Sequence, residues 1–177
     1  MLDVPLQLSA PGLTLRRLRR GDAPMVLAAL QDAGGLRHLP WAPLADLAAA
    51  ERMIAQVEAA AEKRRGYAFA LLPKGERAAG GWIGFDHRGS TLVVGYVLAP
   101  SHWGRGLASL ALGAIVDWGL AQADIHRIEA RCHPDNAASI RVLEKTGFQL
   151  EGRLRRAEHF PNLGRDPQDC LLFARVR

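Results

Sequence analysis

"VLAPSHWGRGLASLAL", residues 97–112, is the stretch that decides the fold of this chain. An apolar run ends at Pro100, the glycines Gly104 and Gly106 follow, and apolar residues then recur at helical spacing. Glycines let the backbone approach a ligand closely, and the N–H groups and dipole at a helix start favour a phosphate. The stretch therefore predicts a strand, a glycine turn and a helix. The turn either cradles a phosphate or only joins the two elements.

Two common phosphate-binding loops do not match this turn. A nucleoside triphosphate loop needs Lys followed by Ser or Thr after its second glycine, and "GRGLAS" has neither. A dinucleotide fingerprint needs a third glycine where Ser109 stands and an acid at the end of the next strand, whereas Asp124 precedes that strand. The turn also lies past the middle of the chain, which leaves little room for a full doubly wound sheet. Triphosphate hydrolysis and NAD binding are both disfavoured.

The composition is that of an ordinary globular domain. The chain has 177 residues, of which 49% are hydrophobic and 23% charged, enough for one domain with a real core. No apolar run approaches the ~20 residues that cross a bilayer, and the N-terminus does not resemble a signal peptide. We therefore expect a cytoplasmic protein without membrane contact. The net charge of +5 suits anionic ligands, but no aromatic residues interleave with the basic run 15–22, so direct nucleic-acid binding is not expected.

The two cysteines, Cys132 and Cys170, lie in apolar stretches far apart in the sequence. A disulfide framework is uncommon in a cytosolic chain of this length, so we expect buried, inert thiols. Metal binding needs more ligands than "RCHPD" supplies, since only Cys132 and His133 are adjacent there. No metal site is expected.

The remaining pattern predicts one α/β (α+β) domain with a mixed sheet. Segments with strand alternation or composition are 13–18, 67–73, 79–87, 91–98, 125–132, 148–160 and 169–176. Segments with helical periodicity or end signals are 23–33, which Asp22 would cap, 45–64, 106–121 and 137–146. Short turns in the middle predict antiparallel hairpins. The two strands that flank the helix at 106–121 should run parallel.

A second motif, "NAASIRVLEKTGF" at residues 136–148, begins about thirty residues after the glycine turn. The two motifs together resemble the GCN5-related N-acetyltransferase (GNAT) superfamily, whose acyl-CoA loop reads Q/R-x-x-G-x-G/A. Residues 103–108 fill that frame, with Trp103 in place of the basic or amide residue. This variant and "APGLTLRRLRRGDA" near the start are similar to the ribosomal-protein N-terminal acetyltransferase (RimJ/RimL-like) branch. The resemblance covers about residues 13–175.

The resemblance implies a fold and an activity. The fold is a GNAT-like mixed, mostly antiparallel seven-stranded sheet with about four helices, splayed at the strands that flank the CoA site, in a single N-acetyltransferase domain over residues 1–177. The activity is transfer of an acetyl group from acetyl-CoA, as co-substrate, to a primary amine by direct attack on the thioester, with the N-terminal α-amine of a ribosomal or other protein as the favoured acceptor. The alternatives are a small amine (a polyamine, amino acid or amino sugar) or a non-catalytic acyl-CoA-binding module. Relatives often pair, so a homodimer is expected.

The resemblance also assigns residues to the donor. Backbone amides of the turn would hold the CoA pyrophosphate, and the exposed backbone of the preceding strand would bind pantetheine. Asn136 would bind pantetheine amides or only cap its helix, and Arg141 would reach the phosphates or only coat the helix surface. The remaining residues assigned to CoA are Val97, Leu98, Ala99, Trp103, Gly104, Arg105, Gly106, Leu107 and Ala108.

Acetyl transfer to an amine needs a neutral amine, a donor for the oxyanion and an acid for the leaving thiolate. Many relatives place a tyrosine just before "EK" as the acid, but here that position is Leu143, and the only tyrosines are Tyr67 and Tyr96. Ser139, in the first turn of its helix, is then expected to bond the CoA sulfur, or else only to cap the helix. No cysteine stands at the loop, so an acyl-cysteine intermediate is not expected.

The candidate general base is Glu158 in "LEGRLRRAEHF", where the resembling branch carries an acidic residue. Strand alternation places Glu158 and His159 on opposite faces. Weaker candidates are His87, Glu129 and His159. Each of these can instead be a solvated strand residue, with bulk water taking the proton from the amine.

The loop between the first two predicted helices carries His38 and Trp41. Loops at this place in the family wall the acceptor cleft, so both residues are substrate-site candidates. An aromatic residue there can equally cap the core.

Overall fold

The computed structural model describes residues 2–32 and 34–177. Within these residues it has four α-helices and two short 3₁₀ helices: α1 Ala23–Ala29, α2 Leu47–Glu62, α3 Leu107–Leu120, α4 Ala137–Lys145, η1 Arg20–Asp22 and η2 Pro100–His102. The strands are β1 Gln7–Ala10, β2 Leu13–Arg17, β3 Gly66–Pro73, β4 Gly81–Arg88, β5 Thr91–Leu98, β6 Arg127–Cys132, β7 Gln149–Glu158 and β8 Gln168–Val176.

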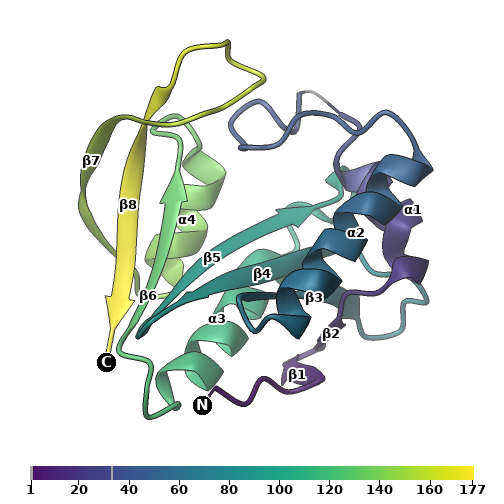
Figure 1. Ribbon diagram of the computed structural model, residues 1–177, viewed down its shortest axis with the longest axis horizontal. Coiled ribbons are helices and arrows are strands. Elements are labelled where there is room, and N and C mark those ends of the chain that lie inside the picture. The colour runs from purple at the N-terminus through teal and green to yellow at the C-terminus, as the bar shows by residue number, and fades with distance from the viewer. Residues whose placement is uncertain (1, 33) are drawn as a thin grey trace.

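All described strands belong to one sheet with the order β1-β2-β3-β4-β5-β6-β8-β7 (Figure 1). Neighbouring strands are antiparallel except β5 and β6, which run parallel on either side of α3. The predicted mixed, mostly antiparallel sheet, its hairpins and its one parallel pair are therefore confirmed, as are the four helices.

The sheet has eight strands where seven were predicted. The additional strand, β1, pairs antiparallel with β2 from Gln7↔Arg16 to Ala10↔Leu13. Gly12 turns the chain between them with φ of +73°, a conformation that suits glycine. The four residues "QLSA" carry no strong strand propensity and are only half-buried or exposed. Pairing with β2 rather than local pattern makes this strand, which is why the sequence did not indicate it.

The bounds of two helices, α1 and α2, differ from the prediction by more than one residue. Helix α1 ends at Ala29 rather than 33, a position that lies outside the described residues. Helix α2 begins after Asp46, whose side chain accepts a hydrogen bond from the Ala49 N–H at 2.7 Å, and it ends at Glu62. Helix α2 ends before Gly66, which belongs to β3, because Arg64 already has a left-handed φ of 56°.

Asp22 occupies the predicted N-cap position of α1, but its carboxylate does not cap the helix. It accepts hydrogen bonds from the Arg16 guanidinium at 2.7 and 2.8 Å and from the Arg19 N–H at 3.0 Å. The buried carboxylate thus joins β2 to the turn before α1. A capping pattern concerns only the first residues of the helix, so it does not predict a partner on β2.

The buried apolar residues form two clusters on the two faces of the sheet. Helix α3 covers one face with Leu112, Ile115 and Val116, which pack with Phe69 and other strand residues. Helices α1 and α2 cover the other face. Both cysteines are buried and free, as predicted. None of the helices in the described residues is long and apolar enough to span a membrane.

The sheet splays between β5 and β6. The two strands pair from Thr91↔Arg127 to Val94↔Ala130, and beyond this point they diverge (Figure 1). Strand β5 nevertheless stays paired with β4 as far as Leu98↔Gly81. The last four residues of β5 thus have a β4 partner on one side and a gap on the other, as the predicted splay required.

Candidate active site

Two cavities meet in the gap between β5 and β6. The turn pocket, of about 470 Å³, is lined by the glycine turn, the end of β5 and helix α4. The cleft pocket, of about 450 Å³, is lined by residues 38–41, helix α2, the middle of β4 and Glu158. Leu39, Tyr96, Asn136 and Ser139 line both pockets. A ligand in one pocket can therefore reach a ligand in the other through the gap.

The glycine turn has a conformation that requires glycine. Gly104 and Gly106 have φ of +74° and +75°, in the left-handed region that costs other residues about 1–2 kcal/mol. A Cβ at either position would meet no atom within 4 Å, so the need is conformational and the turn faces open space. Gly106 is the N-cap of α3, and Leu107, Ala108 and Ser109 of the first turn line the turn pocket. Unpaired N–H groups at such a helix start suit an anionic pyrophosphate.

Arg105 does not line the turn pocket. Its guanidinium pairs with Glu76 at 2.5 Å, and the same carboxylate lies 2.9 Å from Nε2 of His102. The hydrogen bond from Arg105, with the one from His102, lowers the pKa of Glu76. Arg105 thus ties the turn to the β3–β4 connection, and the arginine and lysine that do line the pocket, Arg141 and Lys145, come from α4.

The end of β5 presents backbone groups to the gap. Val97 and Leu98 line the turn pocket, whereas the Ala99 N–H is taken by the Gly80 carbonyl at 2.9 Å. Backbone groups alternate in direction along an antiparallel strand, so the Leu98 N–H and C=O point away from β4. The Leu98 carbonyl accepts a hydrogen bond from the Trp103 indole at 2.9 Å. Of the three residues assigned to pantetheine, Leu98 is therefore the one whose N–H is directed into the gap, and by the same alternation the Tyr96 N–H also points there.

Trp103 lies at the rim of the turn pocket with 52% of its surface exposed. Its ring packs on Gly35, where an added Cβ would lie only 3.0 Å from the indole. Gly35 belongs to the connection between α1 and α2, the same loop that carries His38 and Trp41. Trp103 therefore links the glycine turn to the wall of the cleft pocket.

Helix α4 begins at the junction of the two pockets. The Asn136 side-chain oxygen accepts a hydrogen bond from the Ser139 N–H at 3.1 Å, so Asn136 is an N-cap. Its NH₂ group and the Ser139 hydroxyl make no hydrogen bond within residues 2–32 and 34–177, although both residues line the two pockets. Capping thus uses the side-chain oxygen of Asn136 and leaves its NH₂ group available at the junction of the two pockets.

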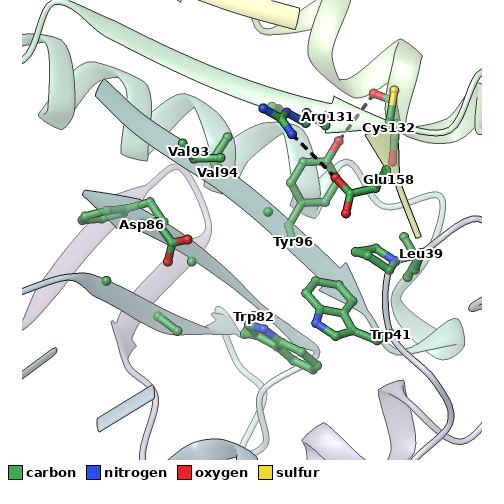
Figure 2. A pocket seen from close by; sticks show the side chains of 18 of the residues that line it. Leu39, Trp41, Trp82, Asp86, Val93, Val94, Tyr96, Arg131, Cys132 and Glu158 are labelled. Carbon is green, nitrogen blue, oxygen red and sulfur yellow. Dashed lines mark hydrogen bonds and ion pairs between the residues drawn. The ribbon is translucent and has the colours of Figure 1, made fainter. Parts of the chain in front are cut away.

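Tyr96 was not among the predicted site residues. Its phenol projects from β5 into the gap and donates to the Ser139 carbonyl at 3.4 Å (Figure 2). Burial raises the pKa of Tyr96 above its ordinary value, so the phenol stays protonated and remains a donor. In the family pattern the tyrosine acid stands on the helix that corresponds to α4. The available signal was that Tyr96 immediately precedes the β5 residues assigned to pantetheine.

Glu158 lines the cleft pocket and faces Arg131, with 3.9 Å between the carboxylate and the guanidinium (Figure 2). His159 is exposed and contacts the Arg165 carbonyl through Nε2 at 3.2 Å, so the two neighbours do take different sides. The other base candidates, His87 and Glu129, line neither pocket. Glu158 is therefore the one predicted base that reaches the cleft.

Cys132 also lines the cleft pocket (Figure 2). Burial raises the pKa of its thiol to about 11, so it is protonated at neutral pH. A protonated thiol is a poor nucleophile, which agrees with the expectation that no acyl-cysteine forms.

Trp41 forms one wall of the cleft pocket. Its ring packs at van der Waals distance over Gly95, where an added Cβ would lie 3.9 Å away, and its centroid lies 6.1 Å from that of Trp82. Figure 2 shows the two indoles side by side, with Asp86 farther along β4. Trp41 thus lies over β5 at the residue before Tyr96, with space for a methyl group between its ring and Gly95.

His38 stacks on His133, with 4.8 Å between ring centroids and 13° between ring planes. Burial, together with His133 and Arg37, lowers the pKa of His38. His38, His133 and Asp135 are close enough to share an ion, but an imidazole binds a metal in its own plane, and two nearly parallel planes do not converge on one point. The pair is better suited to packing than to metal binding.

The sheet is splayed, a glycine turn opens the next helix, and two pockets meet in the gap. These features are those of a protein that brings a phosphate-bearing donor to a second substrate. The comparisons with known proteins agree. Residues 12–149 match the model of the acetyltransferase (GNAT) domain family. The uncharacterized N-acetyltransferase p20 of Bacillus licheniformis is 31% identical over 149 residues, which cover 82% of this chain and 84% of the relative. The chain therefore belongs to the GNAT family of N-acetyltransferases.

Two further similarities concern proteins with named ligands or acceptors. The ribosomal-protein-serine acetyltransferase of Escherichia coli (strain K12) is 35% identical over 116 residues, which cover 64% of this chain and 63% of that protein. The structure of Mycobacterium smegmatis RimJ in complex with CoA-disulfide superimposes with a TM-score of 0.82 at 27% identity, covering 96% of this chain and 85% of that one.

Proposed function

We propose that this acetyltransferase moves the acetyl group of acetyl-CoA directly to the N-terminal α-amine of a protein. The observation that carries the proposal is the junction of the two pockets at Leu39, Tyr96, Asn136 and Ser139. A thioester that enters through the turn pocket and an amine that enters through the cleft pocket meet there. Both pockets have volumes in the range of ligand sites.

On the donor side the proposal uses the residues that the sequence assigned to CoA and that line the turn pocket, with Lys145 in addition. N–H groups of the glycine turn and the first turn of α3 would hold the pyrophosphate, and Arg141 and Lys145 add positive charge. The Leu98 N–H and the Asn136 NH₂ would bond pantetheine amides. Arg105 would act through its pair with Glu76, which orders the turn, rather than as a phosphate ligand.

The chemistry follows from the groups at the junction. The amine nitrogen attacks the thioester carbonyl carbon, and the carbon–sulfur bond breaks. Glu158 takes the proton that the nitrogen loses, directly or through one water molecule. The CoA thiolate leaves and takes a proton from the hydroxyl of Tyr96 or Ser139, and that hydroxyl then regains a proton from solvent. The Tyr96 phenol is neutral and has a single O–H, so this group must turn from the Ser139 carbonyl to donate to the leaving sulfur.

The choice of a protein N-terminus rests on relatives and on the charge of the cleft. The similar protein from Escherichia coli is named for a ribosomal-protein serine acceptor. A polyamine is the second candidate, because two carboxylates, Asp86 and Glu158, line the cleft pocket. Each of them, however, already has an arginine partner, Arg88 at 3.2 Å and Arg131 at 3.9 Å. The cleft therefore lacks the net negative charge that a polyamine would need.

A thiol-release assay with acetyl-CoA tests the proposal. The acceptor panel contains peptides with a free N-terminus, the same peptides with a blocked N-terminus and an internal lysine, polyamines, amino acids and amino sugars. We expect release only with free N-termini, and mass spectrometry should place the acetyl group there. Release only with polyamines or other small amines would overturn the acceptor assignment. Calorimetric binding of acetyl-CoA without release on any acceptor would instead indicate a binding module.

We also propose that residues 1–177 form one N-acetyltransferase domain and that two copies pair. The domain proposal is supported by the single sheet to which all described strands belong. The pairing follows from the family resemblance, and light scattering after size-exclusion chromatography measures it.

A further inference from the structure

Asn162 lies in the connection between β7 and β8 and reaches across to a distant part of the chain. Its side-chain Nδ2 donates to the Leu36 carbonyl at 2.9 Å and to the Trp41 carbonyl at 2.8 Å. These carbonyls stand at the two ends of the segment 36–41, which carries His38, Leu39 and Trp41. One half-buried amide group thus fixes both ends of this segment.

The segment 36–41 borders the gap in which the pockets meet. Trp41 walls the cleft pocket, and Leu39 lines both pockets. Pairing of Val94 with Ala130 closes the narrow end of the gap. At the wide end, the β7–β8 loop and the α1–α2 loop approach each other above the diverging strands (Figure 1). The hydrogen bonds of Asn162 therefore connect the two loops at the wide end of the gap.

The segment makes other contacts, but these do not replace the two hydrogen bonds of Asn162. The His38 ring stacks on His133, and the Leu39 N–H bonds to the Leu36 carbonyl within the segment. Neither contact joins the segment to the β7–β8 loop. An amide NH₂ suits the place because it offers two hydrogens to two carbonyls, whereas a carboxylate of the same shape offers none.

We propose that Asn162 is a positioning residue for the acceptor: it fixes Leu39 and Trp41 against the gap and so sets the shape of the cleft pocket. This inference rests on the proposed assignment of the cleft pocket to the acceptor amine. Asn162 touches neither reacting atom, since it lines neither pocket. Its effect should appear in acceptor binding far more than in donor binding.

The test compares Asn162→Asp with Gln122→Glu. The first variant keeps the shape and removes both donors. The control makes the same amide-to-carboxylate change at a side chain that also donates to a carbonyl, that of Trp118 at 3.0 Å, away from both pockets. For Asn162→Asp we expect the KM of the acceptor to rise about tenfold, with the KM of acetyl-CoA within about twofold of the wild type. Gln122→Glu should leave both constants unchanged.

Asn162→Ala separates loss of the donors from the added charge and should act in the same direction. An unchanged acceptor KM in both Asn162 variants, or equal rises in both KM values, would overturn the proposal. Hydrogen exchange provides a readout that does not need turnover: amides in residues 34–43 should exchange faster in Asn162→Asp than in the wild type or Gln122→Glu. If no amine is acetylated, the proposed function fails, but unchanged exchange in this segment is what refutes the role of Asn162.

Discussion

The Tyr96 phenol donates a hydrogen bond to the main-chain carbonyl of Ser139, and this contact joins β5 to the first turn of α4 across the gap. The two residues are 43 positions apart in the sequence. Both residues line the turn pocket and the cleft pocket, so two hydroxyl groups lie where these pockets meet. In the proposed reaction the leaving thiolate therefore has two candidate proton donors, and only Ser139 was evident from the sequence.

Replacing Tyr96 with Phe should lower kcat. The variant keeps the ring that fills the gap and removes the O–H, so loss of an acid should cost about a hundredfold, at the lower end of the range for acid–base catalysis. The KM of acetyl-CoA should change little, because Phe preserves the packing. Because burial raises the pKa of Tyr96, the wild-type rate should show no alkaline loss from this group below its ordinary pKa of about 10. Steady-state kinetics from pH 6 to pH 10 measure both effects.

Ser139→Ala tests the other candidate acid, the Ser139 hydroxyl. If Tyr96 protonates the thiolate, this variant should retain kcat within about threefold, a change of well under 1 kcal/mol in the barrier. A large fall in kcat with Ser139→Ala and none with Tyr96→Phe would assign the acid to Ser139, as the sequence analysis suggested.

Glu158→Gln should lower kcat/KM about a hundredfold or more and remove a pH-dependent step on the acid side of the profile. The amide keeps the size and polarity of the side chain but accepts no proton from the amine. His159→Gln is the matched control, because the neighbouring side chain lies outside both pockets. A pH–rate profile that is the same in wild type and Glu158→Gln would exclude Glu158 as the base.

Gly106→Ala should weaken acetyl-CoA binding beyond its cost in stability. The methyl group would project into the space where a pyrophosphate is expected, so the KM of acetyl-CoA should rise about tenfold, comparable to one lost charge-assisted hydrogen bond. Gly12→Ala is the control: Gly12 has nearly the same φ, +73° against +75°, and also has no atom within 4 Å of an added Cβ. Both variants should lose about 1 kcal/mol of stability, but only Gly106→Ala should change the KM. Equal KM values in the two variants would contradict a phosphate role for the turn.

Asp22→Asn should destabilise the fold by about 2 kcal/mol at neutral pH, measured by urea unfolding, because it leaves the Arg16 guanidinium without its carboxylate. Burial alone would raise the pKa of Asp22, but hydrogen bonds from Arg16 and the Arg19 N–H outweigh it and lower the pKa. A lowered folded-state pKa adds stability above the unfolded value and loses it as pH falls through the folded value. The difference in the free energy of unfolding between wild type and variant should therefore become smaller below about pH 4. If this difference stays constant with pH, the charge of the Asp22 carboxylate is not the source of the stabilisation.

Much of the fold was predictable because the signals were local. The run at 91–98 gave β5 with its observed bounds, and the glycine turn and "NAASIRVLEKTGF" indicated the two helices beside the turn pocket. Strand β1 was missed because four weakly patterned residues become a strand only through their pairing with β2. Asp22 was misassigned as a cap because its partner Arg16 lies on another element.

The sequence by itself determined the family, the glycine turn and many of the residues that line the turn pocket, because these depend on short motifs whose residues are neighbours in the chain. Only the tertiary structure decided which groups meet in the gap. Tyr96 reaches Ser139 from another element, Trp103 and Trp41 lie on glycines far away in the sequence, and Asn162 bonds the loop at 36–41. The reason is physical: such contacts depend on how separate elements pack, and no local periodicity specifies the packing.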